Sequence, residues 1–206
     1  MLNIIHPKIW IYKMKGKPKK YSEKEFKISE DLTSKKRLTY LESRSYIREA
    51  IAHFYNCDPL DVPLVAEPGE PPLLLDDLGE ISISHCNDAL LFGIFNDKIG
   101  VDIERSDRKF NHSAIAKRYF YNYKYKDLVR KDVLADWTII EAAIKWDKGK
   151  ISEDLCFWEI KKKKNLALNK RKNISINFSQ FNFIDWTISL AYEGANNKND
   201  ILCNNF

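Results

Sequence analysis

Ile99-Gly100-Val101-Asp102-Ile103-Glu104 is a short run in which apolar and acidic residues alternate. Successive side chains of a strand point to opposite faces, so Val101 and Ile103 are expected to face a core. Asp102 and Glu104 then share the other face, where two carboxylates repel one another unless a cation lies between them. The run predicts a cation site or, in the simpler interpretation, two acids on the solvent face of an edge strand.

Gly100 precedes the two acids on the same face of this predicted strand. A glycine inside a strand weakens it, and it is typical of a place where another group approaches the backbone closely. Two acids on an exposed face would not need such a residue. The glycine therefore favours a site on this face.

Around this run the sequence predicts a mixed α and β protein. Ser34 is a suitable helix cap, apolar residues then recur at helical spacing as far as Asp58-Pro59, and Gly149 suits the end of a later helix. Residues 96–98 are expected to form a hairpin turn between strands at 89–95 and 99–104. The other predicted strands are 9–12, 80–84, 155–160, 174–178 and 186–192, and the predicted helices are 34–58, 113–120 and 132–146.

The order strand, helix, strands occurs twice along the chain. This order predicts two similar α+β halves, residues 1–98 and residues 99–206, which meet near 96–100 in a pseudo-two-fold arrangement. Five of the seven prolines fall in the segment 59–72, which is expected to be an irregular connection. The second half would carry the acidic pair.

The overall charge suggests an anionic partner. The 206 residues include 34 basic and 29 acidic side chains, which gives a formal net charge of +5. This balance suits a nucleotide or an acidic protein, and it is well below that of a dedicated nucleic-acid binder.

The four cysteines predict neither a zinc site nor a disulfide framework. Cys57, Cys86, Cys156 and Cys203 are scattered with no close pair, as expected of reduced thiols in a cytoplasmic protein. The sequence has no apolar stretch long enough to span a bilayer and no secretion signal. We therefore expect a cytoplasmic protein that is not embedded in a membrane.

Three further residues carry side chains suited to chemistry. Glu141 and Lys145 are one turn apart on the predicted helix 132–146, on a face that Trp137 places next to the buried stripe. His85 follows Ser84 at the end of a predicted strand, where a phosphate could be met. The simpler interpretations are a surface ion pair and a structural histidine.

Taken in order, these residues resemble a family signature. The order of three sequence blocks is similar to the pattern of the 4'-phosphopantetheinyl transferases, in particular the two-halved type that activates surfactin synthetase. These blocks are Ser84-His85, residues 100–104 and Trp137-x-x-x-Glu141-Ala142-x-x-Lys145. The resemblance covers roughly residues 34–152. It also includes Arg44, Arg118-Tyr119-Phe120 ahead of Tyr125, and Gly149-Lys150-Ile151-Ser152.

The resemblance implies the fold of that family and an enzymatic activity. The 4'-phosphopantetheine group of coenzyme A would pass to a serine of an apo acyl or peptidyl carrier protein, with release of adenosine 3',5'-bisphosphate. Mg²⁺ would be held by Asp102, Glu104 and Glu141, a ligand set that suits this ion. A monomer is expected, and the carriers of fatty acid, polyketide and nonribosomal peptide synthesis are all candidates.

The same resemblance implies roles for the basic residues. Glu141, Lys145 and His85 would be catalytic, with Glu141 accepting the serine proton directly or through a metal-bound water. Lys145 and His85 would contact the pyrophosphate, and a guanidinium suits the 3'-phosphate. The residues implied to bind coenzyme A are Arg44, Lys36, Arg37, Ser84, His85 and Lys145, with Lys35 nearby. The basic segment 118–131 is the expected docking face for the carrier.

Three positions depart from the family pattern. Glu70 and Ile140 stand where lysine is common, and Lys124 stands where an acid is usual. One alternative is therefore an inactive member that only binds carrier proteins. A second alternative is a nucleic-acid-binding protein that uses the lysine runs 161–164 and 170–172, expected on one hairpin connection, with Phe157 and Trp158 stacking on bases.

Overall fold

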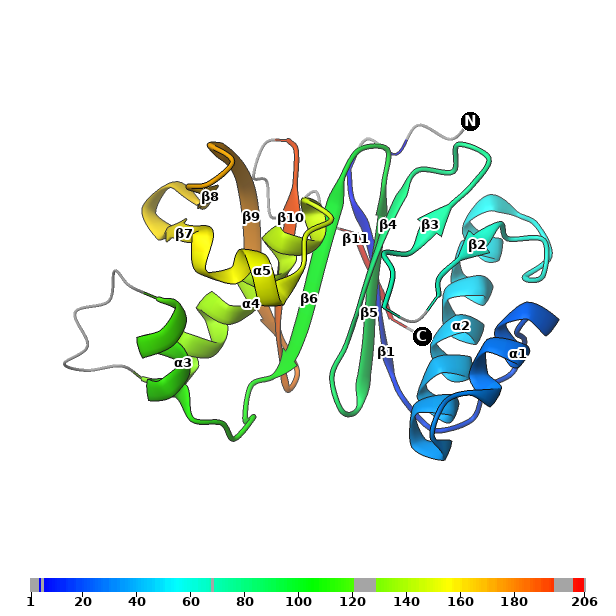
Figure 1. Ribbon diagram of the computed structural model, residues 1–206. Coiled ribbons are helices and arrows are strands. Elements are labelled where there is room, and N and C mark those ends of the chain that lie inside the picture. The colour runs from blue at the N-terminus through cyan, green and yellow to red at the C-terminus, as the bar shows by residue number, and fades with distance from the viewer. Residues whose placement is uncertain (1–3, 5, 68, 121–128, 195–201, 206) are drawn as a thin grey trace.

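The structure is a computed structural model, and it describes all residues except 1–3, 5, 68, 121–128, 195–201 and 206. Its strands form a four-stranded sheet, a five-stranded sheet and a small two-stranded ribbon (Figure 1). The expectation of a mixed α and β protein with several sheets is confirmed.

The first sheet has the strand order β11-β1-β5-β4. Strands β1, β5 and β4 are antiparallel neighbours, whereas β11 pairs in parallel with β1. The sheet thus combines strands from both sides of residue 98. Its strands are β1 (Lys8–Lys13), β4 (Glu80–His85), β5 (Ala89–Phe95) and β11 (Leu202–Asn205).

The second sheet is antiparallel and has the order β6-β10-β9-β8-β7. The two sheets pack together through a cluster that joins Ile9 and Leu91 of the first sheet to Val101, Ile103 and Ile188 of the second. Its strands are β6 (Ile99–Arg105), β7 (Trp158–Lys161), β8 (Leu166–Asn169), β9 (Ile174–Phe183) and β10 (Trp186–Tyr192).

Helices cover the outer faces of these sheets (Figure 1). The long helix α2 (Ser34–Tyr55) packs its Ile47 and Ile51 against Trp10 and Phe92 of the first sheet. Helix α4 (Arg130–Trp146) contacts β6 and β10 of the second sheet. The shorter elements are α1 (Glu23–Glu30), α3 (His112–Tyr119), α5 (Ile151–Asp154), the 3-10 turns η1 (Leu155–Phe157) and η2 (Lys162–Lys164), and the ribbon strands β2 (Leu64–Val65) and β3 (Leu73–Leu74).

The predicted hairpin between the strands at 89–95 and 99–104 is wrong. Strand β5 already has β1 on one edge and β4 on the other, so it has no free edge for β6. After residues 96–98 the chain crosses to the second sheet, where β6 pairs along its whole length with β10. β6 nevertheless runs beside β4, and the Val101 N–H donates to Ser82 Oγ at 3.1 Å.

Several predicted boundaries also need correction. The cap residue of α2 is Thr33 rather than Ser34, and Lys148, with φ 52°, takes the left-handed position that ends α4 in place of Gly149. Residues 155–157 form a 3-10 turn instead of a strand. The ribbon of β2 and β3 lies inside the segment 59–72 and just beyond it, where an irregular connection was expected.

Gly100 is required because α4 lies directly on β6. A Cβ atom at this position would lie 1.9 Å from the Ala142 carbonyl oxygen and 2.5 Å from the Trp146 nitrogen. Both are backbone atoms of α4, which cannot move aside as a flexible side chain would. The close approach that the sequence indicated is therefore made by a helix of the protein itself.

Replacing Gly100 with alanine is expected to lower the free energy of unfolding by about 3 kcal/mol or more, because α4 must be displaced. Gly16→Ala is the matched control: nothing lies within 4 Å of its added Cβ, and only the backbone angle of +69° is unfavourable. A cost of about 1 kcal/mol is expected there. Urea unfolding of both variants measures the difference, and equal costs would contradict the proposed role of Gly100.

Candidate functional site

The candidate site lies where β4, β6 and α4 meet, and Lys145 is at its centre. The Lys145 ammonium donates to Asp102 Oδ1 at 2.7 Å, to Ser84 Oγ at 2.8 Å and to the Val101 carbonyl at 3.1 Å. The Ser84 hydroxyl in turn donates to Asp102 Oδ1 at 2.7 Å. One residue from each of the three elements thus meets in a single hydrogen-bonded group.

Three carboxyl groups gather around this cation, as the alternation in 99–104 predicted. Asp102 is only 2% exposed, and Glu141 lies one helical turn before Lys145, with its Oε2 4.0 Å from the ammonium. Glu104 is half-buried on the same strand face as Asp102 and forms an ion pair with Arg108. The sequence therefore correctly placed the acids on one face.

The carboxyl groups disfavour one another's ionised forms. Burial raises the pKa of Glu141 to about 8, and the negative charges of Asp102 and Glu104 add to this effect against the attraction of Lys145. Burial raises the pKa of Glu104 to about 7, where Arg108 opposes the rise and Asp102 adds to it. Two neighbouring carboxyls with raised pKa values indicate a site that lacks positive charge.

The three carboxyls have the chemistry of a ligand set for a hard cation. No group of three or more His, Cys, Asp or Glu side chains among the described residues is arranged to hold a metal ion as the side chains stand. However, Asp102 Oδ2 is buried and has no hydrogen-bond partner. An orphaned carboxylate oxygen beside two acids of raised pKa fits Mg²⁺, which takes few carboxylates together with phosphate oxygens and water.

His85 stands next to this group at the end of β4. The pKa of its imidazole is lowered to about 4, first by desolvation among the surrounding protein atoms and then by the positive charges of Arg44 and Lys145, although the residue keeps access to solvent. It lines an open cavity of about 690 Å³ together with Glu104 and Arg108. An anion in this cavity would meet the positive charges of Arg105, Arg108 and Lys109 and the imidazole of His85.

Arg44 lies deeper in the protein than its predicted role requires. It is 6% exposed, its Nη2 donates to the Ala66 carbonyl at 2.9 Å, and its guanidinium stacks on Tyr40. Its Nε is buried without a partner, so one donor remains for a ligand. Arg48, one turn further along α2, is buried in an ion pair with Glu25.

Lys36 and Arg37 are not brought into this group by any described contact. Lys36 is exposed in the first turn of α2, and the Arg37 guanidinium lies over the ring of Phe26 at 4.9 Å. Glu70, the acid in place of a common lysine, is also exposed. Lys124, Tyr125 and most of the expected docking segment 118–131 lie outside the described residues.

Arg108 is the functional residue that the sequence interpretation missed. It follows Glu104 by four positions, and the chain beyond β6 returns it to that carboxylate. The signal was a basic residue shortly after the second acid. Its meaning was hidden because residues 106–111 have no periodic pattern.

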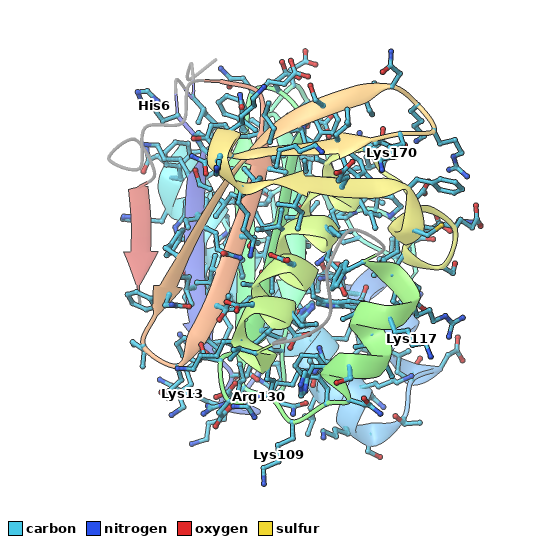
Figure 2. The ribbon with its side chains drawn as sticks, turned by 90° about the vertical axis from the view of Figure 1, so that its left-hand side faces the viewer. His6, Lys13, Lys109, Lys117, Arg130 and Lys170 are labelled. Carbon is cyan, nitrogen blue, oxygen red and sulfur yellow. The ribbon has the colours of Figure 1, made fainter. Side chains whose placement is uncertain are left out.

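The two lysine runs line one cavity together, and acids partly neutralise them. Lys161 and Lys170 both pair with Glu159, and Lys162 pairs with the buried Asp136 at 2.7 Å. The runs occupy two separate turns at the ends of β8 instead of one hairpin connection. Figure 2 shows Lys170 at the upper end of the molecule and Lys109 and Arg130 at the lower end.

One aromatic residue of the nucleic-acid interpretation is not available for stacking. Trp158 is 4% exposed and belongs to the core under α4, so it cannot stack on a base. The ring of Phe157 is covered by the guanidinium of Arg171 at 4.4 Å. The described aromatic residues that share a cavity with these lysines are Tyr119, Phe120 and Phe157, together with the buried Trp158.

No protein-family model matches the chain, and no curated protein matches its sequence. Among the residues that the structure describes, no helix combines the length and the apolar character that crossing a bilayer requires.

The raised pKa values predict how stability depends on pH. Both carboxyls bind protons more tightly in the folded state than in the unfolded chain. The free energy of unfolding should therefore fall as the pH rises from about 6.5 to about 8, with a slope of up to ~1.4 kcal/mol per pH unit for each group, whereas below about 6.5 the lowered pKa of His85 contributes a slope of opposite sign.

Glu141→Gln, which cannot ionise, should reduce this slope, and millimolar Mg²⁺ should raise the unfolding temperature of the unmodified protein more at pH 8 than at pH 5. Thermal unfolding across this range measures both effects. A slope unchanged by Glu141→Gln would contradict the raised pKa of Glu141.

Proposed function

We propose that this protein transfers the 4'-phosphopantetheine group of coenzyme A to a serine of an apo carrier protein, as a 4'-phosphopantetheinyl transferase. The observation that carries the proposal is the meeting of Asp102, Glu104 and Glu141 with Lys145 and Ser84 at the junction of the two sheets. Anionic and cationic side chains alternate there within hydrogen-bonding reach, which suits a substrate made of phosphates bridged to a metal ion.

The chemistry is a phosphoryl transfer. The serine oxygen of the carrier forms a bond to the phosphorus that bears pantetheine, and the bond from that phosphorus to the bridging oxygen breaks. Adenosine 3',5'-bisphosphate leaves with the bridging oxygen. Mg²⁺ held by Asp102, Glu104 and Glu141 would supply a counter-charge for the pyrophosphate.

The residues of the chain provide the other parts of this reaction. Lys145, which can exchange its bond to Asp102 for one to a phosphate oxygen, would neutralise the pyrophosphate from the protein side, and the uncharged imidazole of His85 would donate a hydrogen bond to it. Glu141 is the candidate to accept the serine proton, because a raised pKa makes a carboxylate a stronger base. Arg44 would offer its free Nε to the 3'-phosphate after a shift of the side chain that exposes this atom, which is buried in the structure.

A second cavity suits the uncharged part of coenzyme A. It has a volume of about 510 Å³ and is lined by Ile140, the residue before Glu141, by the aromatic rings of Tyr119, Phe120 and Phe157, and by the charged side chains of Glu159, Lys161, Lys162, Lys163, Lys164 and Lys170. Pantetheine carries amides and a thiol but no charge. Ile140, a departure from the family pattern, would replace a charge with an apolar contact to this arm.

The proposal includes the two-halved arrangement of the family. The first sheet with α2 would correspond to one half, and the second sheet with α4 to the other. The site would then lie between the halves, with Ser84 and His85 from one and Asp102, Glu104, Glu141 and Lys145 from the other.

Transfer can be tested by incubating the purified protein with coenzyme A, Mg²⁺ and several apo acyl and peptidyl carrier proteins. Mass spectrometry of the carriers should detect the added phosphopantetheine, and chelation of Mg²⁺ should abolish it. Unmodified carriers throughout, from a protein that is folded by circular dichroism, would overturn the proposal. Binding of a carrier without transfer would instead favour the inactive alternative.

Asp102→Asn tests the metal ligand with little change in shape. Transfer is expected to fall at least about a hundredfold, because loss of even an outer contact of a metal site costs ten- to a hundredfold. Asparagine keeps an oxygen for Ser84 and Lys145, so the fold should survive where alanine would leave Lys145 unpaired. Asp97→Asn, at an exposed acid in the crossing between the sheets, is the control with the same charge change and should retain activity.

A further inference from the structure

Asp88 connects the two sheets beside the candidate site. It lies in the turn between β4 and β5, and its Oδ2 is 2.7 Å from the Nη1 of Arg105. Its Oδ1 accepts hydrogen bonds from the Trp186 indole at 3.1 Å and from the Cys86 thiol at 3.4 Å. Both carboxylate oxygens are thus engaged by side chains from different parts of the chain.

The partners of Asp88 belong to the elements that carry the site. Arg105 follows Glu104 at the end of β6, and Trp186 begins β10 directly opposite Arg105 in the antiparallel ladder. His85 ends β4 three residues before Asp88. The carboxylate therefore ties the turn next to His85 to the strand end next to Glu104.

The backbone around Asp88 makes this link stiff. The Cys86 N–H donates to the Ala89 carbonyl at 3.0 Å and closes the turn, and the Asp88 carbonyl accepts from the Met14 N–H at 2.8 Å. The side chains of Asp88 and Arg105 are 27% and 30% exposed, so water weakens their ion pair less than it weakens a fully exposed pair.

The same elements form opposite walls of the cavity of about 690 Å³. His85, Cys86 and Asn87 line it from the turn of the first sheet, whereas Glu104 and Arg108 line it from the second sheet and the chain that follows. The Asp88–Arg105 link spans these two walls. A change in the length or direction of this link would therefore change the width of the cavity.

We propose that Asp88 is a positioning residue that holds His85 at a fixed separation from Glu104 by binding Arg105 and Trp186, and that it thereby sets the affinity of this cavity for the pyrophosphate end of coenzyme A. The ligand part of this inference rests on the proposed function. The mechanical part rests only on the contacts of Asp88.

Asp88→Asn removes the ion pair and keeps an oxygen for Trp186. Asp185→Asn is the matched control, because Asp185 also faces Arg105, at 3.8 Å, but lies in the turn between β9 and β10 of the second sheet. Amide hydrogen exchange at Cys86 and Met14 reports on the turn without reference to any ligand. Exchange should become about tenfold faster in Asp88→Asn and stay unchanged in Asp185→Asn.

The functional measurement compares the change in KM for coenzyme A with the change in kcat. In Asp88→Asn the KM for coenzyme A should rise about tenfold while kcat stays within about twofold, since the groups that act on the reacting phosphorus are intact. Exchange rates equal to those of the unmodified protein would overturn the proposal. Faster exchange with an unchanged KM would overturn the part of the proposal that concerns the affinity of the cavity.

A second variant tests the same link in case Asp88→Asn does not fold. Arg105→Lys keeps the positive charge but loses the Nη1 contact with Asp88 together with the forked contact with Asp107, and it should move both readouts in the same direction by a smaller factor. Effects of the two substitutions that simply add in the double variant would show that Asp88 does not act through Arg105. If the unmodified protein transfers nothing, the proposed function fails, while the exchange comparison still decides whether Asp88 holds the turn.

Discussion

The contact between α4 and β6 at Gly100 is the constraint on which the rest of the structure depends. Backbone packs on backbone there, so the helix cannot shift along the strand without a clash. This fixed register places Lys145 opposite Asp102, two residues further along β6. β4, which lies beside β6, then adds Ser84 to the same group. A single missing Cβ atom thus determines which side chains can meet.

Much of this arrangement could be predicted because it depends on local periodicity. Strict alternation in 99–104 identified the face shared by Asp102 and Glu104, and the helical repeat in 132–146 placed Glu141 and Lys145 one turn apart. Gly100 signalled a close approach, although the sequence could not say that the approaching group is α4. A sequence pattern predicts well those features of the structure that neighbouring residues determine.

The errors arose where partners distant in sequence decide the outcome. Residues 96–98 resemble a hairpin turn, but only the pairing of β5 with β1 and β4 shows that no edge is left for β6. Trp158 looked available for stacking because its burial depends on α4, which lies elsewhere in the chain. Arg108 was overlooked because an aperiodic segment gives no orientation.

The pairing of β11 with β1 bears on how the protein is made. Residues 8–11 are synthesised long before their partners at 202–205, because 190 residues lie between the two segments. Throughout synthesis of the segment between them, β1 has an open edge onto which another strand can add. Contacts of such long sequence separation also form slowly. The nascent chain is therefore most exposed to mispairing at β1, and a chaperone that covers this edge would aid folding more than one that covers the helices.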